Sequence, residues 1–315
     1  MTVTVVVVNW NSGLLLQECL TKLSEQTVVP QRVIVVDNAS SDGSASCSVQ
    51  FPQVSLIKMP ENCGFAVGNN TALARCKTEF VALLNPDAFP EPNWLECLLI
   101  AASAHPEISA FGSRQLCQNT PDILDGIGDV YHCSGLVWRN RFGARQQPSD
   151  LICKEIFSPC AAAALYRREA LVDVGGFDND YFCYVEDVDL GFRMRLVGHK
   201  AVYVADAIVY HVGSATTGGQ HSDFAVYHGH RNIVWTYVKN MPGILFWVFL
   251  PLHLILNLVC LFWFSTQGQA DVIFRAKRDA IMGIPAMWRK RRIIQSNRVA
   301  MYRGVFSVMS KCLFR

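Results

Sequence analysis

Four apolar runs, each followed by a helical or turn-rich segment, constrain the fold of this chain more than any other feature. The runs occupy residues 3–8, 32–37, 54–58 and 80–84. Continuous β-branched and aliphatic residues predict strands that are covered on both faces. Helical spacing follows at 14–24, with Ser12 as the expected cap, and again at 65–76. Alternating units of this length predict an α/β fold with a mostly parallel sheet and helices on both faces.

Polar clusters follow three of these predicted strands. Ligands of parallel sheets bind beyond the carboxyl ends of the strands, so the clusters are expected to face one crevice. Pro86 restricts the backbone, and Asn85 and Asp87 would offer oxygen ligands that suit a hard divalent cation bridging a diphosphate. A simple turn or a helix cap is the alternative for Asp87 and for Asp37. The clusters are Asn9-Trp10-Asn11, Asp37-Asn38 and Asn85-Pro86-Asp87.

The usual glycine-rich phosphate motifs are absent from the sequence. There is no GxxxxGK[ST] anywhere, and no GxGxxG follows the first predicted strand. A bound diphosphate would therefore be neutralised mainly by a metal ion. Asn62, Gly64 and Gly68 surround a predicted helix start, where glycines permit close approach of the backbone and the helix dipole favours anions.

Three acidic residues begin a predicted helix at 186–196. Glu186, Asp187 and Asp189 lie within one turn, so their charges repel and the pKa of at least one carboxyl should rise. Such a carboxylate at a cleft is a candidate general base. The alternative is a solvated acidic turn that complements the helix dipole. His211 ends a later predicted strand, and a purely structural role is equally open for it.

Six stretches in this order resemble the family 2 glycosyltransferases of the GT-A fold, and within them the bacterial rhamnosyltransferase-like group. They span residues 5–216, about two thirds of the chain. The stretches are VVVVNWNS, VIVVDNASSDGS, ENCGFAVGNN, LLNPDA, VGGFDNDYFCYVEDVDLGFRMRLVGHKAVYV and VYHVGSAT.

The resemblance implies a role for each candidate residue. Asn85-Pro86-Asp87 takes the place of the family's metal-binding DxD, with Asn85 standing where the first Asp is expected, so that Asp87 is the firm ligand. His211 would be the second protein ligand and Asp187 the catalytic base. The residues expected around the nucleotide and its sugar are Asn9, Asn11, Asp37, Asn62, Gly64 and Asp87.

The implied activity is an inverting transfer that depends on Mg²⁺ or Mn²⁺. The expected donor is dTDP-L-rhamnose, with another nucleotide sugar such as a UDP-sugar as the alternative. The expected acceptor is a saccharide linked to a polyprenyl diphosphate, in the synthesis of cell-surface polysaccharide of the O-antigen or capsule type. A sugar nucleotidylyltransferase and a non-catalytic membrane scaffold are the competing functions.

The C-terminal part differs in composition from the rest of the 315 residues. Residues 244–265 carry no formal charge, and residues 266–315 carry 11 Lys and Arg against 2 Asp and Glu. Apolar residues followed by cations favour a membrane surface over nucleic acid as the partner. The 12 scattered cysteines, without a CxxC pair, and a strand-like start without a signal peptide favour a reducing compartment.

We therefore predict a catalytic domain over 1–240, with a nucleotide-sugar half over 1–105 and an acceptor and catalytic half over 106–240. Membrane-associating helices with a basic tail would fill 241–315. A cytosolic donor and a basic tail both favour the cytoplasmic face of the inner membrane. Three alternatives stand for 244–265: a re-entrant or interfacial helix pair, a single span, and a buried core helix.

Overall fold

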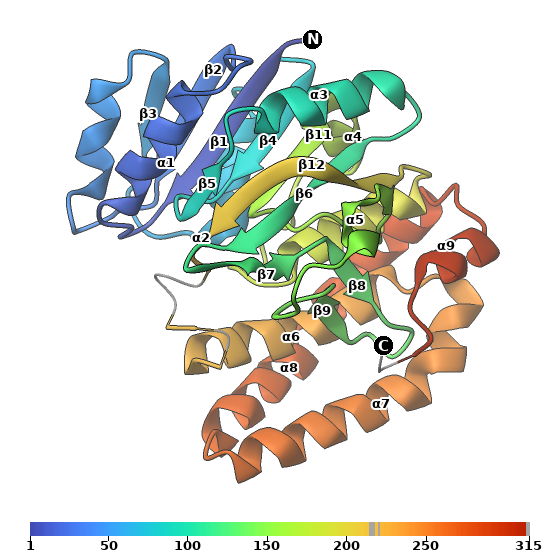
Figure 1. The fold of residues 1–315 in the computed structure, drawn as a ribbon. Coiled ribbons are helices and arrows are strands. Elements are labelled where there is room, and N and C mark those ends of the chain that lie inside the picture. Colours follow the sequence, from blue (N-terminus) through green and yellow to red (C-terminus); the bar gives the residue numbers. More distant parts are fainter. Residues whose placement is uncertain (214–217, 220, 313–315) are drawn as a thin grey trace.

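A computed structural model describes residues 1–213, 218–219 and 221–312, and a ten-stranded sheet forms their centre (Figure 1). The strand order is β10-β12-β6-β11-β4-β1-β2-β3, with β5 paired to β12 and β7 paired to β6. β3, β2, β1, β4, β6 and β12 share one direction, whereas β11 is antiparallel to both of its neighbours. The fold is therefore α/β with a mostly parallel sheet, as predicted. The strands are β1 (Val3–Asn9), β2 (Arg32–Asp37), β3 (Val54–Lys58), β4 (Phe80–Leu84), β5 (Ala88–Pro90), β6 (Ala110–Cys117), β7 (Thr120–Gly126), β10 (Lys154–Glu155), β11 (Ala163–Arg167) and β12 (Ala201–His211).

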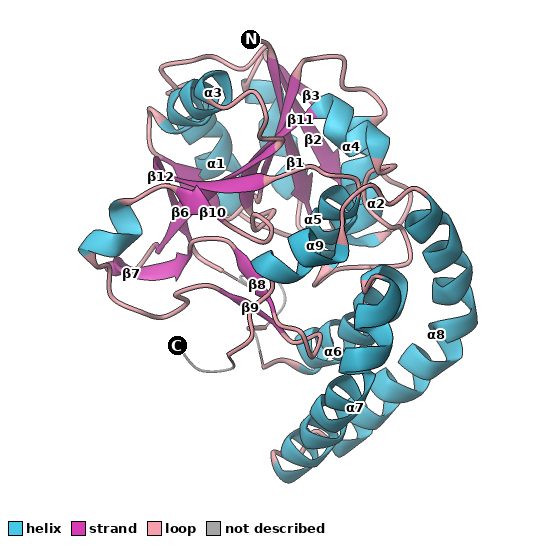
Figure 2. Ribbon diagram, turned by 90° about the vertical axis from the view of Figure 1, so that its right-hand side faces the viewer, coloured by secondary structure: helices cyan, strands magenta, loops and turns pink. Residues whose placement is uncertain are grey.

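Helices cover both faces of this sheet, and a further group of helices lies below it (Figure 2). A small second sheet pairs β8 (Asp129–Tyr131) with β9 (Val137–Arg139). Short 3₁₀ turns occupy Ser44–Gln50 and Pro148–Leu151. The helices are α1 (Leu15–Ser24), α2 (Gly64–Leu73), α3 (Trp94–Ala104), α4 (Arg168–Asp173), α5 (Glu186–Leu196), α6 (Asp223–Asn240), α7 (Gly243–Thr266), α8 (Ala270–Ser296) and α9 (Tyr302–Val308).

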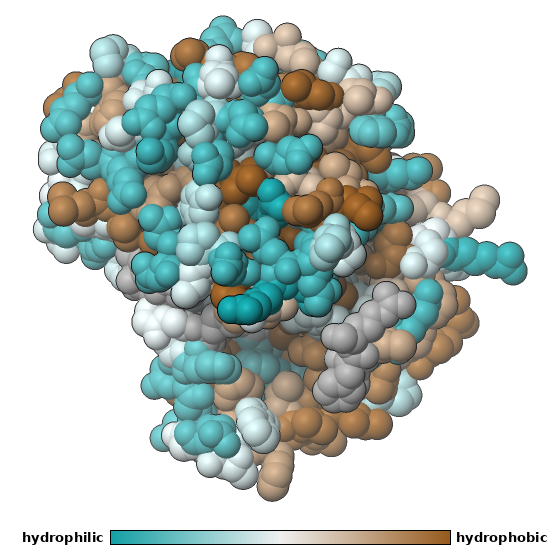
Figure 3. Space-filling view, in the orientation of Figure 1, coloured by the Kyte–Doolittle hydropathy of each residue, from teal (hydrophilic) through white to brown (hydrophobic). Residues whose placement is uncertain are grey.

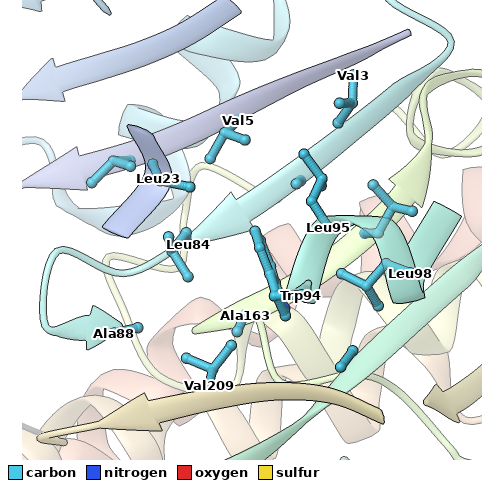
Figure 4. Packing of buried hydrophobic residues seen from close by; sticks show 14 of the residues in the cluster. Val3, Val5, Leu23, Leu84, Ala88, Trp94, Leu95, Leu98, Ala163 and Val209 are labelled. Carbon is cyan, nitrogen blue, oxygen red and sulfur yellow. The ribbon is translucent and has the colours of Figure 1, made fainter. Parts of the chain in front are cut away.

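Alternate residues of β1 enter two different cores. Val3, Val5 and Val7 pack with residues of α1 and α3, in a cluster that includes the fully buried Trp94 (Figure 4). Val6 and Val8 pack on the opposite face with residues of α2, α4 and α5. Side chains of a strand alternate between the faces of its sheet, so this continuous valine run serves both cores. The prediction of strands covered on both faces is confirmed for β1, β2 and β4, whereas β3, at the end of the strand order, is only partly buried.

One local prediction was wrong, because Ser12 does not cap α1. The helix begins at Leu15, and its N-cap residue Leu14 makes no side-chain hydrogen bond. The Ser12 hydroxyl instead donates to the side-chain oxygen of Asn9. The polar residue after the strand is therefore used to organise the strand end and not the helix.

A buried charge network joins the lower helices to α5 and to the loop before it. Lys239 of α6 is fully buried and lies 2.7 Å from Asp189 of α5. It also pairs with Asp178 in the loop before α5. Lys290 of α8 pairs with the same Asp178 and with Asp180, the latter at 2.7 Å. The α8 helix is thus attached by ion pairs to the loop before α5, and it packs against α6 through apolar side chains.

The α7 helix forms a hairpin with α8 and presents an exposed apolar face (Figures 2 and 3). It is long and apolar enough to cross a membrane by length and composition, and within it only Phe246 and His253 are buried. A core helix would be mostly buried, so the buried-core alternative for this segment is wrong. The exposed large apolar residues of α7 are Ile244, Trp247, Val248, Leu254, Ile255, Leu258, Val259, Phe262 and Trp263.

Candidate active site

A cavity of about 1020 Å³ lies at the carboxyl ends of the central strands. Asn85, Asp87, Asp187 and His211, which are far apart in the sequence, all line it. The strand-end clusters therefore do meet at one crevice, as the sequence predicted. Other lining residues include Trp10, Ser12, Asn38, Asn62, Gly64, Asp125, Asp129, Trp138, Arg139, Phe142, Phe182, Tyr184, Val185 and Glu186.

Asp87 and His211 are brought together by strand pairing. β5 pairs antiparallel with the end of β12, with Ala88 opposite His211, so the residue before β5 lies beside the histidine. The Nε2 atom of His211 lies 3.3 Å from Oδ1 of Asp87. Ligands that bind one octahedral cation at about 2.1 Å lie about 3 Å apart. This separation fits two adjacent ligands of one divalent cation.

The other ring nitrogen of His211 is held by a carboxylate. Nδ1 lies 2.8 Å from Oδ2 of Asp125, which also pairs with Arg139. Nε2 is buried and, among the described residues, has no partner in hydrogen-bond geometry. Histidines that bind metals commonly use a carboxylate in this way to orient the free nitrogen. In the part of the chain that the structure describes, no third His, Cys, Asp or Glu completes a cation site, so donor phosphate oxygens and water would supply the remaining ligands.

The charges of this group move the pKa values in opposite directions. Burial alone would lower the pKa of His211, but Asp87 and Asp125 outweigh it and raise the pKa to about 9. Burial would raise the pKa of Asp125, but Arg139 and His211 lower it to about 2. Asp125 thus keeps its negative charge, and His211 must release a proton before its Nε2 atom can bind a cation.

Asp187 is held at the first turn of α5. Its Oδ2 accepts a hydrogen bond from the Ala161 amide at 3.1 Å, and its Oδ1 accepts one from the Val188 amide at 2.8 Å. Burial raises the pKa of Asp187 above its usual value, although the Ala161 hydrogen bond opposes the shift. A carboxylate that lines a cavity, is partly buried, fixed in position and raised in pKa is suited to accept a proton.

The turn before Asp187 is strained. Tyr184 and Val185 both have left-handed backbones, with φ of 66° and 67°. Asn232 of α6 is fully buried and donates to the carbonyls of Cys183 and Tyr184 at 2.9 and 2.8 Å. Left-handed conformations are unfavourable for residues other than glycine, and most of all for β-branched ones. Asn232 therefore helps to hold the turn that directs Asp187 into the cavity.

Asn9 and Asp37 lie side by side at the ends of β1 and β2, in register. The Asn9 amide donates to Asp37 at 3.0 Å and to Ser40 and Ser44, and its side chain is completely buried. The side-chain oxygen of Asn11 accepts a hydrogen bond from the Ser41 amide at 2.8 Å. None of Asn9, Asn11 and Asp37 is among the residues that line the cavity, whereas their neighbours Trp10, Ser12 and Asn38 are.

Asn62 and Gly64 do line the cavity, at the start of α2. The Asn62 side chain accepts a hydrogen bond from the Gly64 amide at 3.0 Å. Gly64 has φ of 83°, and a Cβ there would clash with the backbone oxygen of Phe182. Only glycine meets both conditions, and it lets the loop before α5 approach the N-terminus of α2.

Residues 4–175 match the family model described as glycosyl transferase family 2, which is more than half of the chain. The chain belongs to this family. Ser214, Ala215 and Thr216, at the end of the last sequence stretch that resembled it, lie outside the described residues.

Named relatives of this glycosyltransferase include rhamnosyltransferases. It is 32% identical over 247 residues to the N-acetylglucosaminyl-diphospho-decaprenol L-rhamnosyltransferase of Mycobacterium tuberculosis, which covers 68% of this chain and 77% of the relative. It is 25% identical over 214 residues to the O-antigen chain rhamnosyltransferase RfbN of Salmonella typhimurium, covering 67% and 66%. These relatives place it with the rhamnosyltransferase-like group.

A solved structure shares the fold of the glycosyltransferase. The mannosyltransferase PcManGT from Pyrobaculum calidifontis, in complex with GDP-Man and Mn²⁺, superposes with a TM-score of 0.57 at 19% identity, covering 97% of this chain and 86% of that one. The GT-A fold is thereby confirmed. Family membership also decides against the nucleotidylyltransferase and the non-catalytic scaffold.

Sequence reasoning missed three residues of the glycosyltransferase's cavity. Asp125, Asp129 and Arg139 come from β7, β8 and β9, in a segment without clear periodicity. Asp129 and Arg139 are opposite each other across the β8–β9 pair. A signal was present in residues 125–129, where two acids alternate with glycines and an isoleucine, as in a turn that presents side chains.

Proposed function

We propose that this chain is an inverting, metal-dependent glycosyltransferase that moves a sugar from a nucleotide donor to a hydroxyl of a lipid-linked saccharide. The observation that carries the proposal is the presence of Asp87, His211 and Asp187 in one cavity, with the first two 3.3 Å apart. A pair of ligands for one cation and a separate base are what a single displacement at an anomeric carbon requires.

Asp187 acts as the general base in this mechanism. It takes the proton of the acceptor hydroxyl as that oxygen forms a bond to the anomeric carbon, while the bond from this carbon to the diphosphate breaks. Attack on the side opposite the departing diphosphate inverts the anomeric configuration. Mg²⁺ or Mn²⁺, held by Asp87 and His211, would neutralise the nucleoside diphosphate as it departs. Asn9 and Asp37 keep the strand ends in place beside the nucleotide.

The relatives support a choice of donor and acceptor. Two of them are named as rhamnosyltransferases, and one name includes N-acetylglucosaminyl-diphospho-decaprenol. We therefore favour dTDP-L-rhamnose as donor and a polyprenyl-diphosphate saccharide as acceptor, in cell-surface polysaccharide synthesis. A UDP-sugar is the alternative donor.

The C-terminal helices support placement on a membrane surface, beside a catalytic domain that ends near residue 240. α8 runs back beside α7 and carries Arg275, Arg278 and Asp279, whose charges would enter the lipid if α7 crossed a bilayer. We therefore propose that the hairpin lies in the interface on the cytoplasmic face, with the apolar face of α7 in the lipid. A cavity of about 300 Å³ that Arg292 and Arg298 help to line would suit anionic headgroups.

The test uses the full chain with a panel of nucleotide sugars, Mn²⁺ or Mg²⁺, and a short-chain polyprenyl-diphosphate N-acetylglucosamine. Release of nucleoside diphosphate and the mass of the lipid product report transfer, and dTDP-L-rhamnose should give the highest rate. Asp187→Asn should lower kcat by about 10²–10⁴-fold and leave the donor Kd unchanged. Absence of transfer with every donor, or wild-type turnover by Asp187→Asn, would refute the proposal.

A further inference from the structure

The β8–β9 hairpin contributes one wall of the cavity. Asp129 of β8 and Val137, Trp138 and Arg139 of β9 all line it, and so does Phe142 in the turn that follows. The mechanism above assigns no role to these residues. Asp129 and the proposed base Asp187 line the same cavity.

Two buried carboxylates of this region lack the partners that buried carboxylates usually have. Oδ2 of Asp129 and Oε2 of Glu186 are buried, and neither has a hydrogen-bond partner among the described residues. Both side chains belong to residues that are only 7% exposed and that line the cavity. An unsatisfied buried carboxylate is costly, so such atoms point to donors that a ligand brings. Hydroxyl groups of a saccharide are donors of this kind.

The charge of the region restricts the ligand further. Burial raises the pKa values of Asp129, Glu186 and Asp187, so an anion would meet acidic groups there, and Arg139, the cation beside them, is already paired with Asp125. A diphosphate is therefore unsuited to this part of the cavity. A neutral ring with several hydroxyls is suited to it, particularly beside an aromatic side chain, because such pockets combine apolar walls with a few placed polar groups.

We propose that Asp129, Glu186 and Trp138 form a subsite for a neutral hexopyranose, the acceptor sugar whose hydroxyl is presented to Asp187. The inference rests on the proposed function and names the part of the acceptor that the cavity recognises. The two carboxylates accept hydrogen bonds from hydroxyls that do not react, and the indole covers an apolar face of the ring. The lipid diphosphate lies outside this subsite.

The test compares Asp129→Asn and Trp138→Ala with Asp122→Asn, a control at an exposed acid of the neighbouring β7. The probe is the short-chain polyprenyl-diphosphate N-acetylglucosamine, used with whichever donor the wild type accepts. Disturbing a hydrogen bond at this buried side chain should raise the acceptor KM about 10- to 100-fold for Asp129→Asn. Donor Kd should stay within about twofold, and the control should match the wild type.

Deoxy analogues of the acceptor sugar supply a second readout. The wild type should lose activity with one deoxy analogue, and Asp129→Asn should no longer distinguish that analogue from the parent sugar. An unchanged acceptor KM in both cavity variants overturns the inference. So does a fall in kcat with a shifted pH profile at constant acceptor KM, because Asp129 would then act on Asp187 and not on the sugar. These outcomes require an active wild type, whose inactivity would instead refute the proposed function.

Discussion

Replacing Asn232 by alanine tests how the fold directs Asp187. The substitution removes the two hydrogen bonds to the carbonyls of Cys183 and Tyr184, in a fully buried position. Each hydrogen bond contributes about 1 kcal/mol, and leaving its partner without a donor costs about 1–3 kcal/mol. The left-handed backbones of Tyr184 and Val185 each store about 1–2 kcal/mol, which the remaining contacts must then hold.

We expect Asn232→Ala to lower the free energy of unfolding by about 2–4 kcal/mol. Relaxation of the turn would displace Asp187, and kcat should fall about 10- to 100-fold. Denaturant unfolding followed by circular dichroism and steady-state kinetics measure the two effects. Asn93→Ala is the matched control, since this exposed asparagine precedes α3 without a side-chain hydrogen bond.

A second substitution separates strain from other causes. Glycine adopts the left-handed region without penalty, so Val185→Gly in the Asn232→Ala background should recover about 1 kcal/mol of stability and part of kcat. The reasoning is refuted if Asn232→Ala unfolds within about 0.5 kcal/mol of the wild type, the range of an ordinary surface substitution.

Three further predictions concern pH, metal and membrane. Burial raises the pKa of Asp187, and only the ionised base is active, so kcat/KM should fall on the acid side at a pH above the ordinary aspartate pKa of about 3.9. An acid-side fall in kcat/KM centred at or below that pH would contradict the raised pKa. Asp125→Asn removes the carboxylate that orients His211, so it should raise the Mn²⁺ concentration for half-maximal activity about 10- to 100-fold. An unchanged Mn²⁺ requirement would count against an orienting role of Asp125. Trp247→Glu with Phe262→Glu should abolish co-sedimentation with anionic phospholipid vesicles, and equal binding by this variant and the wild type would show that α7 is not the lipid contact.

The sequence predicted the parts of the fold whose pattern is local. The valine run of β1, the polar clusters at the ends of β1, β2 and β4, and the acidic start of α5 each carry their signal within a few residues. Asp125 and Arg139 could not be found in this way, because they lie in strands without clear periodicity whose positions depend on their pairing with β6 and β8. His211 ends a strand as predicted, and that strand, β12, has a register shift between Val204 and Ile208.

Ser12 illustrates a different limit. A serine before a helical pattern predicts a helix cap. In the structure, the Ser12 hydroxyl instead donates a hydrogen bond to Asn9 at the end of β1. The local sequence shows which hydrogen bonds a side chain is able to make, and tertiary contacts determine which of them forms. The same reasoning explains why Asn232, ordinary in sequence, could not be linked to the turn before α5.

The ion pairs of Lys239 and Lys290 have a consequence for acceptor choice. Lys290 fastens α8 to Asp178 and Asp180 in the loop before α5, and Lys239 joins the same Asp178 to Asp189 of α5, so a tilt of the hairpin would also move the Asp187 carboxylate. If α7 rests on a bilayer, the height of Asp187 above the lipid is a constant of the fold. A glycolipid with too few or too many sugars would then hold its acceptor hydroxyl too close to the lipid or too far from it to reach Asp187. The enzyme would therefore select acceptors by the length of their saccharide.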